Sequence, residues 1–325
     1  MFCGYPKIRN VLKMLALASQ LRAGCRLAAP HGRPAGQGTG AAAVLRYGFR
    51  TLGAIALMLA AAAASPEPTA YVLAVHPYLS APEIQKRFAP LAEYLGQQLG
   101  RPVQVRVGSN YEEHISFVGQ DAVDIAYIGP AAYVTVVERF GPKPILARMQ
   151  TKGKPYLSGV IFVRQDSDIR ELADLRGKRF AFGDPQSTMG SLMPRYVLRE
   201  AGISLQDLGH VSHVFSHDNV VLGVLAGDFD AGAVRIDVYD EMASRGLRPI
   251  ALLPAVSEHV FVTRSNLPPQ DIARLRQALL QLAASSDGPR ILHTISVDAT
   301  GMEPASDADY DGVRKAVRAL AKDRG

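Results

Sequence analysis

Cysteine is nearly missing from this sequence. The 325 residues include only two, Cys3 and Cys25, and both precede the position at which we expect the precursor to be cut. The mature chain would then hold no thiol, so disulfides play no part in its fold. Neither cysteine stands at an expected cleavage site, and a lipid-anchored form is therefore not supported.

Acidic residues are missing from the first 65 positions, which carry eight Lys and Arg. The remaining chain has 28 basic and 30 acidic residues, a balance of −2, although the whole chain has a formal charge of +6. The positive charge thus belongs to the N-terminal segment. The rest of the chain has no excess of basic residues that could bind nucleic acid.

A hydrophobic run long enough to cross a bilayer is also missing. The basic segment 46–50 precedes an apolar run, 52–63, of about a dozen residues, which is too short for a comfortable span. Small residues follow, and we expect residues 46–65 to be a signal peptide cleaved near Ala64, which makes the mature chain periplasmic. Residues 1–45 are a presequence, interpreted as an over-extended start with true initiation near residue 44 or 45.

Signatures of catalysis are absent as well. The sequence shows no nucleophile with a matched base, no carboxylate pair at a usable spacing and no glycine-rich phosphate loop after a strand. We expect neither enzyme activity nor a cofactor. With 48% hydrophobic and 20% charged residues, the chain is globular in class and long enough for two domains.

The mature chain reads as alternating strands and helices in two similar halves. Hydrophobic patterning predicts strands over 70–75, 103–107, 123–128, 180–182 and 231–236, with amphipathic helices between them. This order predicts an α/β fold of two lobes, each a mostly parallel sheet flanked by helices.

Two connections between the lobes are predicted. The long apolar strand 156–164 would lead into the second lobe, and the segments 251–255 and 260–263 would lead back. Such a split arrangement, with two crossings at a hinge, is that of type II periplasmic binding proteins. The expected boundaries are 66–157 for the first part of lobe 1, 158–253 for lobe 2, and 254–325 for the return to lobe 1 and the C-terminal helices.

The stretch from Phe180 to Gly190 has the pattern of strand, turn and helix start. A turn at 183–185 ends the strand, and Ser187 or Thr188 offers an N-cap before an apolar helix that should bend at Pro194. Free backbone N–H groups, two hydroxyls and a glycine together suit a phosphate-like anion. An ordinary capped helix would show the same pattern.

Three segments, 123–130, 182–190 and 216–221, the last followed by a turn and strand at 227–232, occur in a characteristic order. Through them, residues from about 70 to 285 resemble the phosphonate/phosphite substrate-binding proteins of ABC importers, the PhnD-like family. The resemblance implies a monomeric protein that closes on a tetrahedral oxyanion and delivers it to an inner-membrane permease.

The resemblance also implies a set of site residues. The oxyanion would lie on the helix start, with a tyrosine of the first lobe and a histidine of the second as further donors. The expected ligand-binding residues are Tyr111, Tyr127, Gly129, Ser187, Thr188, Met189, Gly190, His217, Asp237 and His259. Alternatives remain for three of them: Tyr127 could pack at a strand end, His217 could cap its helix, and Asp237 could be a surface acid.

Two departures from the family pattern bear on the ligand. Met189 stands where the family has a third hydroxyl, which removes one donor and leaves the backbone N–H. Asp237 and His259 stand where the family has acids that receive an aminoalkyl tail. A shorter acid and a histidine argue against an aminoethyl tail, and small phosphonates, phosphite or phosphate become comparable candidates.

Histidines at 210, 213 and 217 would suggest a metal site by composition alone. Residues 210 and 213 belong to a predicted strand and would point to opposite faces, so we expect no metal. Two rival functions use the same fold. One is a sensor that docks on a membrane histidine kinase, and the other is a periplasmic enzyme.

Overall fold

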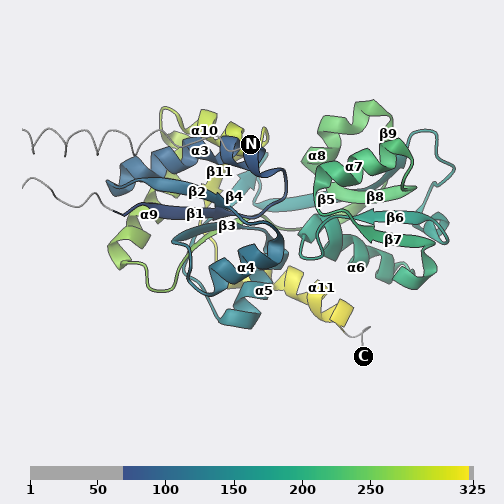
Figure 1. Ribbon diagram of the computed structural model, residues 1–325, viewed down its shortest axis with the longest axis horizontal. Coiled ribbons are helices and arrows are strands. Elements are labelled where there is room, and N and C mark those ends of the chain that lie inside the picture. The colour runs from purple at the N-terminus through teal and green to yellow at the C-terminus, as the bar shows by residue number, and fades with distance from the viewer. Residues whose placement is uncertain (1–68, 322–325) are drawn as a thin grey trace, which may run out of the picture. The chain divides into compact units, whose positions relative to one another are not determined.

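A computed structural model of the protein describes residues 69–321 (Figure 1). The expected presequence, 1–45, and signal peptide, 46–65, lie outside the described residues. None of the helices within 69–321 combines the length and the apolar character that crossing a bilayer requires.

The first sheet has six strands in the order β11-β4-β10-β3-β1-β2. Strand β1, next to the edge strand β2, runs parallel to β2 and β3, whereas the β10–β3, β10–β4 and β11–β4 pairs are antiparallel. The strands are β1 (Tyr71–Val75), β2 (Val103–Val107), β3 (Ile125–Ile128), β4 (Ile145–Thr151), β10 (Val260–Thr263) and β11 (Ala299–Glu303).

The second sheet has five strands in the order β7-β6-β8-β5-β9. Here β6 is parallel to β7 and β8, and β5 is antiparallel to β8 and β9. The strands are β5 (Tyr156–Arg164), β6 (Arg179–Phe182), β7 (His210–His213), β8 (Ala231–Arg235) and β9 (Leu247–Ser257).

The predicted α/β fold with two lobes is confirmed, but each sheet is mixed where the sequence suggested a mostly parallel one. Parallel neighbours need a crossover helix, and only the β1–β2, β1–β3, β6–β7 and β6–β8 pairs belong to such units. The connecting strands β5 and β9 join the second sheet antiparallel. The expected lobe boundaries, 157/158 and 253/254, fall inside these two strands.

Helices cover both faces of each sheet (Figure 1). Buried residues of α3, α9 and α10 pack on one face of the first sheet, while α4 and α5 pack on the other. In the second lobe, α7 and α8 pack on one face and α6 on the other. The helices are α3 (Ala81–Leu99), α4 (Tyr111–Gly119), α5 (Pro130–Phe140), α6 (Met193–Glu200), α7 (His217–Ala226), α8 (Ile236–Met242), α9 (Pro269–Gln281), α10 (Gly288–Ile295) and α11 (Asp311–Ala321).

Helix α3 shows how the spacing of apolar residues gives a helix one buried face. The apolar residues that recur in it at three- and four-residue steps, Ile84, Phe88, Leu91, Leu95 and Leu99, are all buried. Burial of each such side chain contributes roughly 1.5–3 kcal/mol. Gly100 then ends the helix in the left-handed conformation (φ 67°), which glycine adopts without strain.

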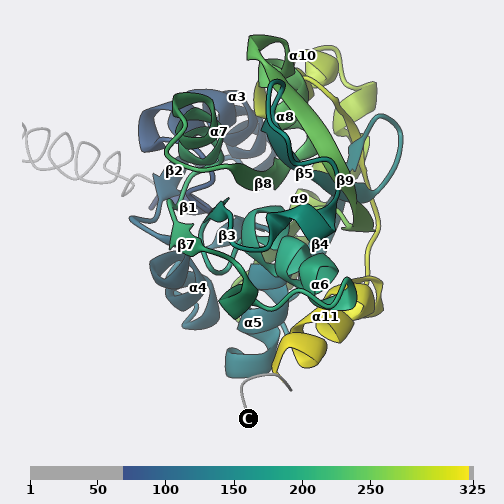
Figure 2. The ribbon, with the colours of Figure 1, turned by 90° about the vertical axis from the view of Figure 1, so that its right-hand side faces the viewer.

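The C-terminal helix α11 contacts both α5 and α6, so it touches helices of both lobes (Figure 2). Its buried residues Val313 and Ala316 belong to the same apolar cluster as Leu198 of α6 and Val134 of α5. The two lobes are thus held together beside the two connecting strands by a third, helical contact.

Candidate functional site

The stretch from Phe180 to Gly190 ends in a capped helix start whose first turn is wider than that of an α-helix. The Ser187 hydroxyl accepts a hydrogen bond from the Gly190 N–H at 3.1 Å. Residues Thr188–Leu192 form a π-helical turn, and α6 follows from Met193. The turn changes to an α-helix directly before Pro194, the residue at which the sequence predicted a bend.

Pro194 also determines how the strand end is tied to this turn. Proline has no N–H, so it cannot bond the carbonyl four residues earlier, that of Gly190. The Gly190 carbonyl instead accepts a hydrogen bond from the Gly183 N–H at 2.8 Å. A Cβ at Gly190 would meet the Ser187 Oγ at 2.9 Å and the Gly183 Cα at 3.2 Å, so only glycine fits here.

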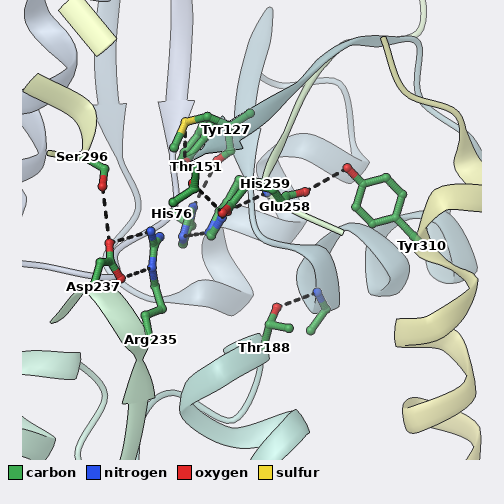
Figure 3. Close-up of polar contacts among 12 residues, drawn as sticks. His76, Tyr127, Thr151, Thr188, Arg235, Asp237, Glu258, His259, Ser296 and Tyr310 are labelled. Atoms are coloured by element: carbon green, nitrogen blue, oxygen red, sulfur yellow. Dashed lines mark hydrogen bonds and ion pairs between the residues drawn. The ribbon is translucent and has the colours of Figure 1, made fainter. Parts of the chain in front are cut away.

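Thr188 links the lobes. Its hydroxyl, in the second lobe, accepts a hydrogen bond from the Ala131 N–H in the first turn of α5 at 2.9 Å (Figure 3). Gly129 is the N-cap residue of α5 and has no side chain to fill that role. Because a hydroxyl can accept and donate at once, the hydrogen of Thr188 remains available to an anionic oxygen.

Tyr111, the first residue of α4, lies opposite this turn. Its hydroxyl lies near that of Ser187, close enough to affect the pKa of Tyr111, so the predicted tyrosine and the predicted helix start are neighbours. The side chain is buried, and burial raises the pKa of Tyr111 well above its ordinary value. It therefore stays a neutral O–H donor at physiological pH.

His217 begins α7 but does not cap it. Ser216 is the N-cap, and its hydroxyl accepts a hydrogen bond from the Asn219 N–H. His217 is buried, and its Nδ1 has no hydrogen-bond partner among the described residues. Burial lowers the pKa of His217 to about 3, so the ring is neutral and one nitrogen is left for a ligand.

Asp237 is not a surface acid. Its carboxylate accepts two hydrogen bonds from the Arg235 guanidinium, at 3.0 and 2.8 Å, and the side chains are 13% and 6% exposed (Figure 3). Burial opposes ionisation of Asp237, but the charge of Arg235 outweighs it, and the pKa of the carboxyl is lowered.

Arg235 is one of the residues that sequence reasoning missed. It ends β8, whose other residues are apolar or glycine and buried. Charged residues are rarely buried, and the carboxyl ends of strands form the ligand edge of α/β sheets. A cation at the carboxyl end of an apolar strand could therefore have been recognised in the sequence as a candidate site residue.

Tyr127 and His259 stack on one another, with ring centroids 4.9 Å apart and an interplanar angle of 12°. The Tyr127 hydroxyl points to the Met149 sulfur at 3.6 Å, so it is engaged inside the first lobe. The His259 Nε2 faces Gly129, where an added Cβ would lie 3.3 Å from it and 3.8 Å from the Thr188 Oγ1. His259 thus stands beside the contact between the lobes.

Met189 is 1% exposed and belongs to an apolar core cluster. A Cβ at Gly159 of β5 would lie 3.0 Å from the Met189 Cβ, so this residue packs on the second sheet. Ser191, not considered from sequence, is fully buried, and its hydroxyl has no partner among the described residues.

A cavity of about 220 Å³ adjoins these groups. Both lobes contribute to it, with charged residues from α3, α7 and α8 and from the end of β8. Its charged and aromatic lining residues are Tyr78, Glu83, Arg87, Tyr127, Asp218, Arg235, Asp237 and Glu241. The cavity is small and carries more acids than bases.

The histidines at 210 and 213 lie away from a common centre. His210 is exposed, whereas the His213 Nδ1 contacts the Gly183 carbonyl at 2.7 Å. Within residues 69–321, no three His, Cys, Asp or Glu side chains are arranged to hold a metal ion.

Over residues 73–310 the sequence matches the family of periplasmic substrate-binding proteins of phosphonate ABC transporters. This match extends over both lobes and every site residue described above. The chain belongs to this family.

Individual members of the phosphonate-binding family agree with this assignment. The phosphate-import protein PhnD of Mycolicibacterium smegmatis is 30% identical over 76% of this chain and 84% of its own length. The phosphonates-binding periplasmic protein of Escherichia coli K12 is 25% identical over 67% of this chain and 68% of its own. The structure of PhnD1 from Prochlorococcus marinus (MIT 9301) in complex with methylphosphonate has the same fold, with a TM-score of 0.73, 21% identity, and coverage of 79% of this chain and 100% of that one.

Proposed function

We propose that this member of the phosphonate-binding family carries a small tetrahedral phosphorus oxyanion to an ABC permease, and that it binds the anion where Ser187, Thr188 and Gly190 meet Tyr111. The supporting observation is the convergence of donors from both lobes on one point. The Thr188 hydroxyl accepts a hydrogen bond from the α5 N-terminus of the other lobe, and Ser187 lies near the Tyr111 hydroxyl. Helix N-termini and neutral hydroxyls are suited to an oxyanion.

Burial makes each of these donors more effective. Ser187, Thr188, Tyr111 and His217 are all at most 5% exposed. Water is excluded when the lobes close, so each hydrogen bond to the anion acts in a medium of low dielectric constant. The Arg235 guanidinium adds a buried positive charge that the family pattern did not suggest.

The size and charge of the adjoining cavity bear on the tail of the ligand. About 220 Å³ is less than the ~300–1,000 Å³ typical of pockets for larger organic ligands. The acids Glu83, Asp218 and Glu241 would repel a second anionic group. We therefore favour phosphite, phosphate or a phosphonate with a short uncharged tail.

The remaining parts of the proposal concern the setting. We infer that residues 46–65 act as a cleaved signal peptide, that the mature protein works as a periplasmic monomer without enzyme activity, and that its partner is an inner-membrane permease. The family match favours a transporter component over a histidine-kinase sensor.

Calorimetric titration of the mature protein with methylphosphonate, phosphite, phosphate and sulfate tests this function. We expect at least one phosphorus oxyanion to bind more tightly than 1 mM. Thr188→Val should weaken it by roughly 10- to 100-fold, because one hydrogen bond to a charged group contributes about 1.5–3 kcal/mol. Thr300→Val, at an exposed position in β11, is the matched control and should bind as the wild type does. If none of the four anions binds below the millimolar range, the proposal is wrong.

A further inference from the structure

Two histidine rings of the first lobe lie nearly parallel beside the anion site, with centroids 4.9 Å apart and an interplanar angle of 17°. The Nε2 atoms of His76 and His259 are 3.3 Å apart, and both rings are buried (Figure 3). Such a contact is favourable only if a proton lies between the two nitrogens, since otherwise two lone pairs face each other. The partners of the other nitrogens decide whether that proton is an extra one.

The Nδ1 of His76 must carry a hydrogen. It lies 3.2 Å from the Tyr127 carbonyl oxygen, which can only accept. In a neutral ring only one nitrogen is protonated, so the Nε2 of a neutral His76 would be an acceptor.

The Nδ1 of His259 must carry a hydrogen as well. It contacts the Glu258 carboxylate, which also accepts from the His259 N–H at 3.0 Å and from the Thr151 hydroxyl at 2.9 Å. These donors favour the ionised carboxylate, and the pKa of Glu258 is lowered in spite of its burial. The Nε2 of a neutral His259 would therefore also be an acceptor.

We propose that His76 and His259 share one additional proton, and that this proton makes oxyanion binding proton-linked. This inference rests on the proposed function. The pair lies at the anion site because the His259 Nε2 and the Thr188 Oγ1 both face Gly129, and because the His76 ring meets Tyr111 edge-on at 5.3 Å. Glu258 is the counter-ion, and Tyr310 fixes its backbone by donating to its carbonyl at 3.0 Å.

The local charge balance shows why this proton matters for an anion. With it, the shared proton and Arg235 offset the carboxylates of Glu258 and Asp237. Without it, the same group of side chains carries one net negative charge next to the anion. Loss of the proton as the pH rises must therefore weaken binding, and binding of the anion must favour uptake of the proton.

The other described groups that face the pair keep their charge near neutral pH. They are Tyr78 after β1, Tyr127 of β3, Tyr111 and His114 of α4, His217 of α7, and the paired Arg235 and Asp237 at the end of β8. Burial raises the pKa of each tyrosine and lowers the pKa of His114 and His217 to about 3. Burial also lowers the pKa of His76 and, against the opposing effect of the Glu258 carboxylate, that of His259. The shared proton is therefore held against burial by the hydrogen bonds to the Tyr127 carbonyl and to Glu258 and by the bound anion, and it is lost as the pH rises.

Nitrogen NMR of the mature protein labelled with ¹⁵N-histidine tests the proton directly, without a ligand. We expect His76 and His259 to show two protonated Nδ1 atoms and one proton shared between the Nε2 atoms. Two neutral rings without a shared proton at pH 6–7 would overturn the inference, whether or not an anion binds.

Methylphosphonate titrations between pH 5.5 and 9 test the linkage. The ionisation of the ligand affects all variants equally, so the difference between wild type and His76→Gln isolates the pair. We expect the dissociation constant of the wild type to rise with pH more steeply than that of the variant, by up to about tenfold per pH unit. His293→Gln, an exposed position in α10, should follow the wild type. Equal slopes for wild type and His76→Gln would refute the linkage, whereas a shared proton without any anion binding would refute the proposed function alone.

Discussion

At the scale of single residues, the sequence predicted polar groups that its motifs display and missed those whose role depends on burial by the fold. Ser187, Thr188 and Gly190 were recognisable because a cap and a glycine follow a strand, and the structure places them at the lobe contact. Arg235 and Glu258 were missed. Their ion-pair partners, Asp237 and His259, are close in sequence, but the burial that makes these pairs important depends on tertiary structure.

Arg235 offers a prediction in which stability and binding can be separated. Arg235→Gln leaves the buried Asp237 carboxylate unpaired and should lower the free energy of unfolding by about 3–5 kcal/mol. The double variant Arg235→Gln/Asp237→Asn removes both charges, so most of the stability should return while oxyanion affinity stays low. Urea unfolding and calorimetry on both proteins check this. A double variant that binds like the wild type would show that Arg235 does not act on the ligand.

His114 gives a prediction for pH. It is fully buried, and burial lowers its pKa to about 3 in the folded protein, whereas an unfolded histidine titrates near 6.5. Between these two pKa values His114 is protonated in the unfolded chain and neutral in the folded chain. The free energy of unfolding is therefore unaffected by this group above pH 6.5 and falls by about 1.4 kcal/mol for each pH unit below it.

His114→Leu should therefore flatten the pH dependence of stability by one proton. Urea unfolding of wild type and variant between pH 7.5 and 5 measures the two slopes. His293→Gln, which changes an exposed histidine, should keep the slope of the wild type. An unchanged slope in His114→Leu would show that His114 is not neutral in the folded protein.

At the scale of elements, hydrophobic periodicity predicted the strands and helices well, because each has one continuous buried face. The expected strands 103–107 and 156–164 coincide with β2 and β5. Strand direction was less predictable. Antiparallel pairing of β5 and β9 depends on how two distant segments meet, and side-chain periodicity is the same for either direction. The π-helical turn was not predicted, because a serine cap followed by a glycine is equally compatible with an ordinary first helical turn.

Gly190 tests whether this turn has to keep its present shape. Gly190→Ala puts a methyl group 2.9 Å from the Ser187 Oγ and 3.2 Å from the Gly183 Cα, so the turn must shift and its N–H groups must leave the site. We expect at least a tenfold loss of oxyanion affinity. Gly312→Ala, in α11 with open space around the new Cβ, should preserve binding and stabilise the protein by roughly 0.5–1 kcal/mol. Wild-type affinity in Gly190→Ala would place the ligand elsewhere.

At the scale of the whole molecule, two sheets are joined by the strands β5 and β9 and are bridged by α11. Neither lobe has the site alone, because Tyr111 and Ala131 come from the first and Ser187 and Thr188 from the second. In the proposed function, ligand binding and closure of the lobes are therefore one process, in which the anion adds hydrogen bonds that only the closed arrangement supplies.

A crystal structure of the mature protein grown with methylphosphonate tests the central claim most directly. The account predicts the phosphorus atom between the lobes, with oxygens within hydrogen-bond distance of the Ser187–Gly190 turn, of the Tyr111 hydroxyl and of His217. The account would be contradicted by an anion bound outside the lobe contact, such as in the groove between α3 and β2. In that case the contact between the Thr188 hydroxyl and the Ala131 N–H would hold no ligand.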